Sequence, residues 1–464
     1  MSSPFTEFLH SANADTIPNE VLGLGRKWLL DLLGVAVGGT QTDMSRIMRD
    51  HAVDHFAAGK HKAQMLFDGR TVSPSGAALA GGITIDALDG HDGHKLTKGH
   101  VGCGVLPALY AFTQAEGLCD DREFLASLVV GYEIGTRAGI ALHRTASDYH
   151  TSGAWISIAA AALGARAMGL DTAKTREAIG IAEYHGPRSQ MMRVIDHPTM
   201  VKDGSGWGAM AGVSAAYLAA DGFTGAPAIT VEGNDVSDLW DDFGQTWRIK
   251  EQYFKHFPVC RWAQPPVQAV LNLREAHGLV SQDVAHIEIT TFHQSKRLAT
   301  RTPKTTEEAQ YSTAYPTAVA MVQGQVTPDD ITADSFDDPE IQRLAMGMRI
   351  IESETYNDAF PANRISSVTL SLRDGRMLVS GDTEAKGDPE APVAMDQVRD
   401  KFHAYAQPKL GAARAKALEN VVAQLGYGGG LGTLSKLVFS PTCQSQSKKG
   451  PDRGSSHARC VAHQ

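Results

Sequence analysis

Residues 154–169 read AWISIAAAALGARAMG, and residues 208–220 read GAMAGVSAAYLAA. Both are runs of small and apolar residues that follow a residue able to cap a helix, Thr151 or Ser152 in the first case and Ser205 in the second. Small side chains allow helices to approach one another closely. The two runs therefore predict central, buried helices of a tightly packed bundle.

The helical pattern extends outward from these runs over residues 16–262. Asp15 precedes a segment with apolar residues at i, i+3 and i+4 spacing, and Asp120 or Asp121 precedes another that begins at Phe124. Two apolar stretches, residues 28–37 and 155–165, are well short of the roughly 20 residues that span a bilayer. We therefore expect buried helices and no membrane partner.

The pattern changes at about residue 265. Residues 286–292 (HIEITTF) alternate apolar and polar side chains, and residues 366–381 (SSVTLSLRDGRMLVSG) form two strand-like runs joined by Asp374-Gly375, a strong hairpin signal. Residues 312–322 between them have a helical pattern. Alternating strands and helices predict a small α/β domain.

The predicted fold class is mainly α, with a large all-helical domain and an inserted, smaller α/β (α+β) lid domain. The helical domain is expected over residues 1–264 plus 393–425, and the lid domain over 265–392. Residues 426–464 are rich in Ser, Gly and basic groups, and we expect them to form a disordered basic tail.

Composition narrows the classes of function. The formal charge is -9 and the pI about 6.0, which argues against a nucleic-acid binder or a protein of anionic membrane surfaces. The five cysteines form no CxxC pair, so neither a disulfide framework nor a cysteine-ligated metal site is expected. The N-terminus lacks the features of a secretory signal. These observations favour a cytoplasmic protein.

The densest unusual stretch covers residues 86–107, DALDGHDGHKLTKGHVGCGVLP. It follows a predicted helix over residues 74–88, so Asp89 faces the negative end of a helix dipole, an unfavourable placement that is frequent at functional carboxylates. A solvated polar loop is the simpler interpretation. A metal site formed by His91, His94 and an aspartate is the third, although the spacing lacks the signature of a helix-borne zinc site.

Four further motifs carry polar residues at predicted helix starts or turns. His150 precedes the alanine-rich helix, where the helix dipole favours a neutral imidazole able to accept a proton. Lys202 stands before the next helix and could hold an anion. The others are residues 255–264 (KHFPVCRWAQ) and 309–316 (AQYSTAYP). Each of these motifs, taken alone, more often has a structural role than a catalytic or binding role.

Taken together and in this order, these motifs resemble the MmgE/PrpD family, which includes 2-methylcitrate dehydratases and cis-aconitate decarboxylases. The resemblance spans about residues 5–425 and includes WLLDLLGVAVGG (28–39), VKDGSGWGAMAG (201–212) and FKHFPVCRW (254–262). It implies a homodimer that works without cofactor or metal, with a large helical domain and a smaller α/β lid domain.

The resemblance also implies site residues. Asp89, His100, His150 and Tyr315 match positions that are catalytic in the family, and the substrate-binding candidates are Lys202, Lys255, Cys260 and Arg261.

Three positions depart from the family pattern. Gly93 and Cys260 stand where the decarboxylases carry a threonine and a histidine, and Gln264 replaces a histidine that many members have. The first two departures weigh against itaconate-forming decarboxylation, and the third weighs against strict 2-methylcitrate dehydration.

The function expected from these residues is that of a lyase of the dehydratase type, acting on a small di- or tricarboxylate by proton removal alpha to a carboxylate. His150 or Asp89 would act as the base, and His100 or Tyr315 would protonate the leaving hydroxyl. Decarboxylation or epimerisation at the same site are alternatives. A non-catalytic carboxylate-binding homologue and a metal-dependent hydrolase are the remaining alternatives.

Overall fold

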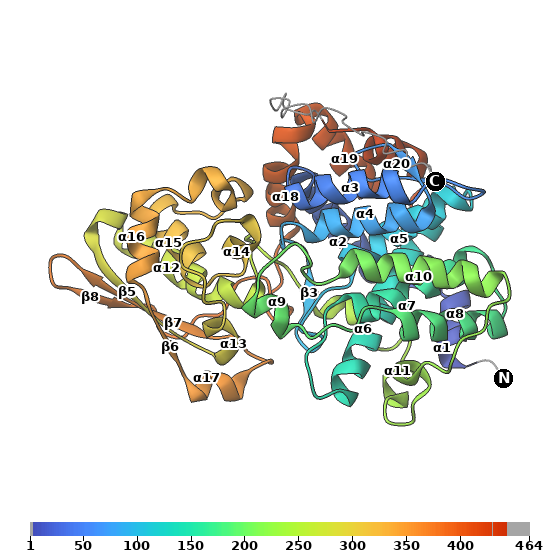
Figure 1. The fold of residues 1–464 in the computed structure, drawn as a ribbon, viewed down its shortest axis with the longest axis horizontal. Helices are drawn as coiled ribbons and strands as arrows, with labels where there is room; N and C mark the ends of the chain where they lie inside the picture. Colours follow the sequence, from blue (N-terminus) through green and yellow to red (C-terminus); the bar gives the residue numbers. More distant parts are fainter. Residues whose placement is uncertain (1–2, 429, 443–464) are drawn as a thin grey trace, which may run out of the picture.

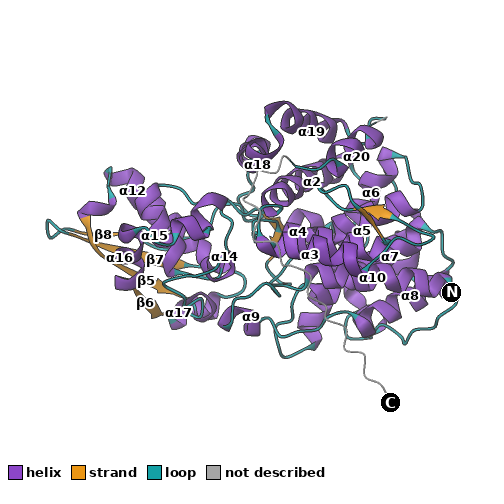
Figure 2. Ribbon diagram, turned by 45° about the horizontal axis from the view of Figure 1, so that its top comes forward, coloured by secondary structure: helices purple, strands orange, loops and turns teal. Residues whose placement is uncertain are grey.

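The computed structural model describes residues 3–428 and 430–442, and these are mainly helical (Figures 1 and 2). Most of the helices form one large body. They are α1 (Pro4–Ser11), α2 (Asn19–Gly39), α3 (Asp43–His55), α4 (Pro74–Asp86), α5 (Gly102–Ala115), α6 (Asp121–Thr145), α7 (Gly153–Ala167), α8 (Thr172–His185), α9 (Met192–Asp196), α10 (Ser205–Ala220), α11 (Ile229–Glu232), α18 (Met395–Leu410), α19 (Ala412–Gln424) and α20 (Leu431–Phe439).

A smaller unit lies beside this body (Figure 1). Its sheet has the strand order β6 (Arg349–Glu352), β5 (Val284–Thr291), β7 (Ser366–Leu372) and β8 (Met377–Val379), in which only the β5–β6 pair is parallel. The expected hairpin is present, with Gly375 at φ +91 in the turn. The elements are α12 (Gln264–His277), β5 (Val284–Thr291), α13 (His293–Lys296), α14 (Thr306–Gln310), α15 (Ala314–Gln323), α16 (Pro339–Gly347), β6 (Arg349–Glu352), α17 (Glu354–Ala359), β7 (Ser366–Leu372) and β8 (Met377–Val379).

The small residues of α4, α7 and α10 bring these three helices into backbone contact. A methyl group on Gly206 of α10 would lie 2.4 Å from the Leu79 carbonyl oxygen on α4, and one on Gly208 would lie 2.3 Å from the Gly153 carbonyl oxygen on α7. The quoted alanine-rich runs are therefore the centre of the bundle because no larger side chain fits between their backbones.

We expect Gly208→Ala to lower the free energy of unfolding by about 1–3 kcal/mol, because the added methyl group has backbone on the facing side and nothing there can move aside. Gly23→Ala on α2 should raise the free energy of unfolding by up to about 1 kcal/mol, because alanine has the better helix propensity and the added methyl group meets no atom within 4 Å. Urea unfolding followed by circular dichroism measures both. Equal effects at the two positions would contradict the packing argument.

The expected disorder from residue 426 onward is wrong for the described part of that segment. Residues 431–439 form α20, in which Leu431, Leu434 and Val438 are buried at helical spacing. The Asp121 carboxylate accepts the N–H groups of Gly426 (2.9 Å) and Gly428 (3.2 Å). The glycine-rich composition masked a short amphipathic helix. Residues 443–464 of the expected tail lie outside the described residues.

The longest helix, α6, was expected only from its capped start. It is long and apolar enough to cross a bilayer, and its whole apolar stretch is buried inside the protein. Burial of this kind is typical of a core helix, and α6 lies among α2, α5 and α7.

Candidate active site

Three turns of the helical body meet at one point: the loop between α4 and α5, the turn before α7 and the turn before α10. The His100 N–H donates to Ser152 Oγ (2.9 Å), and Ser152 Oγ donates to Asp203 Oδ2 (2.7 Å). The Gly153 N–H donates to the Asp203 carbonyl oxygen (3.1 Å). Each of these bonds joins residues that are about 50 positions apart in the chain. All four residues are buried.

A buried ion pair between Lys255 and Asp89 lies in this region. Lys255 Nζ donates to the Asp89 carbonyl oxygen (2.9 Å) and to Asp89 Oδ1, and the two side chains are 1% and 3% exposed. Asp89 has a positive φ of 48°, which turns its side chain and its carbonyl toward the same ammonium group. Burial alone would lower the pKa of Lys255, but the charge of Asp89 outweighs it and raises that pKa above its ordinary value. Lys255 is therefore a permanent cation.

His100 is held with one ring nitrogen free to accept a proton. Its Nδ1 lies 2.6 Å from the Asp92 carbonyl oxygen. A carbonyl only accepts, so Nδ1 carries the hydrogen and Nε2 carries the lone pair. Nε2 lies 3.5 Å from Asp89 Oδ1 and 3.7 Å from Asp203 Oδ2. Burial and the charge of Lys255 hold the pKa of His100 well below its ordinary value, so the ring is neutral.

Lys202 supplies a second buried cation, and the smaller unit reaches it. Lys202 Nζ donates to Gln310 Oε1 and lies 5.2 Å from the centre of the Tyr311 ring. Gln310 Nε2 in turn donates to the Ala87 carbonyl oxygen (2.9 Å). The end of α14 therefore bridges two turns of the helical body at the edge of the cluster.

The structure brings together five of the eight residues expected from the sequence: Asp89, His100, Lys202, Lys255 and Cys260. Cys260 is buried, and burial, with the charge of Asp89, raises the pKa of its thiol to about 12. The thiol is therefore neutral, and Cys260 lines the site without contributing a charge.

The other three expected residues lie elsewhere. His150 is half-buried beside His143, with 6.3 Å between ring centres. The Tyr315 phenol donates to the Asp330 carbonyl oxygen (3.0 Å) inside the smaller unit, and Tyr311 is the tyrosine that faces the cluster. Arg261 donates to Asp388 Oδ1 (2.6 Å) and to backbone carbonyls, so its guanidinium is used within the protein.

Two buried aspartates were missed by the sequence reasoning. Asp86 ends α4, and neither of its carboxylate oxygens has a hydrogen-bond partner among the described residues, although His91 Nε2 lies 3.5 Å away. Asp203 follows Lys202 in the same turn, and burial, reinforced by the charges of Asp86 and Asp89, raises its pKa to about 7. The signal available was the KDGSG motif itself, in which only the lysine was assigned a role.

A metal ion is disfavoured by the chemistry of these residues. Donor atoms of Asp89, His91 and His100 lie within 4.8 Å of one another. However, the Lys255 ammonium group already binds the Asp89 carboxylate, and a divalent cation there would face that positive charge. The expected pairing of His91 with His94 does not form, because His94 Nε2 donates to Glu251 (2.7 Å).

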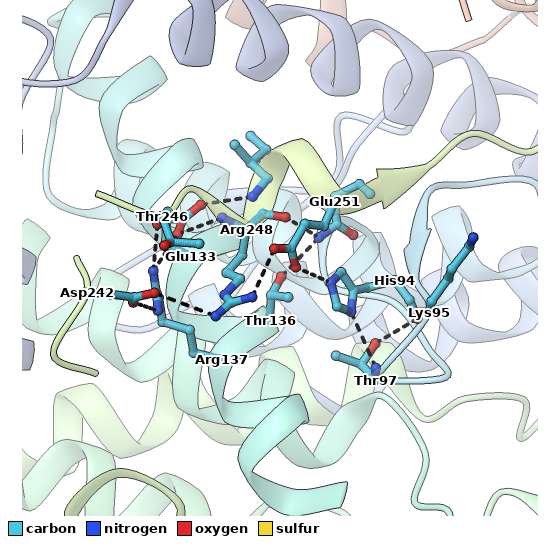
Figure 3. Close-up of polar contacts among 12 residues, drawn as sticks. His94, Lys95, Thr97, Glu133, Thr136, Arg137, Asp242, Thr246, Arg248 and Glu251 are labelled. Atoms are coloured by element: carbon cyan, nitrogen blue, oxygen red, sulfur yellow. Dashed lines mark hydrogen bonds and ion pairs between the residues drawn. The ribbon is translucent and has the colours of Figure 1, made fainter. Parts of the chain in front are cut away.

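A network of charged side chains anchors the chain segment that leads to Lys255 (Figure 3). Glu133 on α6 accepts the backbone N–H of Arg248 (3.0 Å), and burial raises the pKa of Glu133 to about 7. The Arg248 guanidinium donates to Glu251 (2.9 Å), which also accepts from His94. The loop that carries Asp89 and His100 is therefore tied to the segment before Lys255.

That tie continues in a short antiparallel strand pair, β3 (Gly93–His94) with β4 (Gln252–Tyr253). A methyl group on Gly93 would lie 2.4 Å from Tyr253 Oη and 2.8 Å from His100 Nδ1. A threonine, which the resemblance to the decarboxylases implies at this position, would displace both side chains. The packing of Tyr253 and His100 in this site therefore requires glycine at position 93.

A cavity of about 450 Å³ lies near Lys255, on the side of the next residue, His256. Its lining includes Gln268, Asn272, Arg274 and Lys386, and none of the cluster residues. The cluster itself is closed, with His100 only 6% exposed.

The chain matches two family models, the MmgE/PrpD N-terminal domain over residues 3–239 and the MmgE/PrpD C-terminal domain over residues 257–426. It is 23% identical to cis-aconitate decarboxylase-like protein oryM of Aspergillus oryzae, over 91% of this chain and 94% of that protein. It is 22% identical to the cis-aconitate decarboxylase of Mus musculus, over 97% and 95%. A mitochondrial 2-methylcitrate dehydratase of Yarrowia lipolytica is 24% identical over 48% of this chain and 47% of that protein.

Proposed function

The chain belongs to the MmgE/PrpD family, and from this premise we propose that it is a lyase of the dehydratase type that acts on a small di- or tricarboxylate. The observation that carries the proposal is the pairing of a neutral imidazole, His100, with two buried ammonium groups, Lys202 and Lys255. A base beside buried cations suits the removal of a proton alpha to a carboxylate.

The difficult step of such a reaction is removal of the proton, because it leaves a doubly negative aci-carboxylate that must be stabilised. Lys202 and Lys255 would stabilise that charge, and preorganised groups of this kind can supply several kcal/mol. His100 Nε2 would take the proton. A carboxylate bound beside the lysines would also offset the positive field that lowers the pKa of His100. The proposal thus assigns the base to His100. Asp89 is set aside because Lys255 binds it, and His150 is set aside because it lies beside His143.

We further propose that the smaller unit is the lid of this site. Gln310 on α14 contacts Lys202 and the Ala87 carbonyl oxygen, and the cluster is buried beneath these contacts. Substrate entry would require their separation, which would free Lys202 for a substrate carboxylate. The expected absence of a cofactor and a metal, the homodimer, the cytoplasmic location and the lack of nucleic-acid and membrane partners are part of the same proposal.

Decarboxylation of a cis-aconitate-like acid is the second candidate, because the relatives matched over most of the chain are named as cis-aconitate decarboxylases. The packing at Gly93 and the neutral thiol of Cys260 weigh against it. Epimerisation would use the same base, with the proton returned from the opposite face.

The purified protein should exchange a substrate proton for deuterium and release an unsaturated acid when mixed with 2-methylcitrate, citrate or cis-aconitate in deuterium oxide. Proton NMR distinguishes the outcomes. Dehydration turns the methyl doublet of 2-methylcitrate into a singlet, or gives one vinyl CH signal from citrate; decarboxylation of cis-aconitate gives the two signals of a C=CH2 group; epimerisation gives exchange with inversion. Heat-denatured protein is the control.

Absence of both exchange and turnover across a wider panel of di- and tricarboxylates would refute the lyase proposal. A ligand-induced rise in melting temperature without turnover would instead indicate a carboxylate-binding homologue. Stoichiometric zinc, manganese or iron in elemental analysis would return the metal-dependent hydrolase to consideration.

A further inference from the structure

Asp203 is a buried ionisable group of this cluster that the proposed mechanism leaves unused. It is 1% exposed. Its Oδ2 accepts from Ser152 Oγ (2.7 Å), and its Oδ1 has no hydrogen-bond partner among the described residues. Its backbone is fixed as well, since its carbonyl accepts the Gly153 N–H (3.1 Å). A carboxyl group held this firmly with one oxygen unpaired calls for an explanation.

The surroundings of Asp203 combine like and unlike charges. Burial and the neighbouring carboxylates raise its pKa to about 7, so it exchanges a proton near neutral pH. The groups that face it are Asp86 of α4, Asp89 and His100 of the following loop, Lys255 before α12, and the neutral groups Cys103, Cys260 and Tyr311. Lys202, the residue before Asp203, acts on Asp86.

The charge balance of the cluster depends on this proton. With Asp203 protonated, Asp86 and Asp89 are balanced by Lys202 and Lys255. With Asp203 ionised, negative charge is in excess, and a ligand with two or three carboxylates would be repelled. Binding of a polycarboxylate therefore favours the protonated form of Asp203.

We propose that Asp203 is the proton donor of this site: it binds the polycarboxylate in its protonated form and gives that proton to the departing hydroxyl. This inference rests on the proposed dehydration. His100 Nε2 takes the proton from the carbon, and the C–H electron pair forms the C=C bond. The C–O bond breaks, and the hydroxyl takes the proton of Asp203 and leaves as water.

The two groups can then restore one another. After the reaction His100 carries one extra proton and Asp203 lacks one, and His100 Nε2 lies 3.7 Å from Asp203 Oδ2. Proton transfer across this gap, which needs only a small side-chain movement, returns both groups to their starting states. No proton from solvent is required in the buried cluster.

The test measures proton uptake on binding of propane-1,2,3-tricarboxylate, which resembles the substrate and has no hydroxyl to lose. Calorimetry at pH 8 in two buffers of different ionisation enthalpy should show uptake of nearly one proton by the wild type, because Asp203 is mostly ionised at that pH. Asp203→Asn should bind without uptake. Its kcat should fall about 100-fold. Asp337→Asn, an exposed aspartate outside the cluster, should match the wild type.

A second readout separates donation from a structural role and does not need a folded Asp203 variant. Ser152→Ala removes a hydrogen bond that lowers the pKa of Asp203, so the alkaline limb of the kcat profile should move to higher pH. An unmoved limb, an unchanged kcat in Asp203→Asn, or proton uptake retained in that variant would overturn the assignment of Asp203 alone. A wild type that neither binds nor turns over any polycarboxylate would overturn the proposed function as a whole.

Discussion

Replacement of Lys255 by methionine is expected to destabilise the folded protein by about 3–5 kcal/mol, because it leaves the Asp89 carboxylate buried without its partner. The side chains are 1% and 3% exposed, so water cannot solvate the remaining charge. Methionine preserves the length of the lysine stem and much of its packing. The loss should therefore report the unpaired charge, measured as the shift of the urea midpoint at pH 7.

The double variant Lys255→Met with Asp89→Asn separates stability from activity. Removing both charges should recover most of the lost stability, because no unpaired charge remains. Turnover should stay undetectable, because the cation that would stabilise the aci-carboxylate is gone. Recovery of turnover along with stability would show that the pair is structural only.

An exposed pair provides the control for this experiment. Lys250 Nζ lies 3.0 Å from Glu20 Oε2, and the two side chains are 44% and 74% exposed. Lys250→Met should change stability by less than about 1 kcal/mol. A loss as large as that of Lys255→Met would mean that removal of any lysine charge is costly in this protein.

Replacement of His100 by asparagine should lower kcat by about 10²–10⁴-fold, the contribution usual for a positioned general base. The asparagine amide can still donate toward the Asp92 carbonyl oxygen, as Nδ1 does now, while the proton-accepting Nε2 is lost. The pKa of His100 lies well below its ordinary value of 6.5. Because the ring is already neutral there, wild-type activity should show no loss near pH 6.5 that depends on this residue.

The measurement compares deuterium exchange and turnover for His100→Asn and His150→Asn. Loss of exchange in the first variant supports His100 as the base, and loss confined to the second would return that role to His150. His197→Asn, at an exposed position, tests for nonspecific effects of changing a histidine.

Much of the fold follows from local patterns in the sequence. Helical periodicity, caps and runs of small residues predict the mainly helical body, and the hairpin at Asp374-Gly375 predicts part of the smaller sheet. These signals are local because a helix or hairpin is stabilised largely by contacts within a few residues along the chain. The short helix α20 escaped because its glycine-rich flank obscured three apolar residues at helical spacing.

The candidate site was likewise predicted in part from local patterns in the sequence. The motifs that carry polar side chains are readable in the sequence, and they contain Asp89, His100, Lys202, Lys255 and Cys260. Which residues of a motif face one another depends on packing: Tyr311 rather than Tyr315 lies at the cluster, and Asp203 lies beside His100.

The physical reason is that side-chain direction at a turn depends on backbone dihedral angles and on partners far along the chain. Asp89 and Lys202 adopt positive φ angles that no local pattern predicts, and Asp89 meets a lysine 166 positions away. The charge balance at Asp203 likewise arises from groups on several separate segments. Sequence patterns place residues on elements, whereas only packing places their charges in a common space.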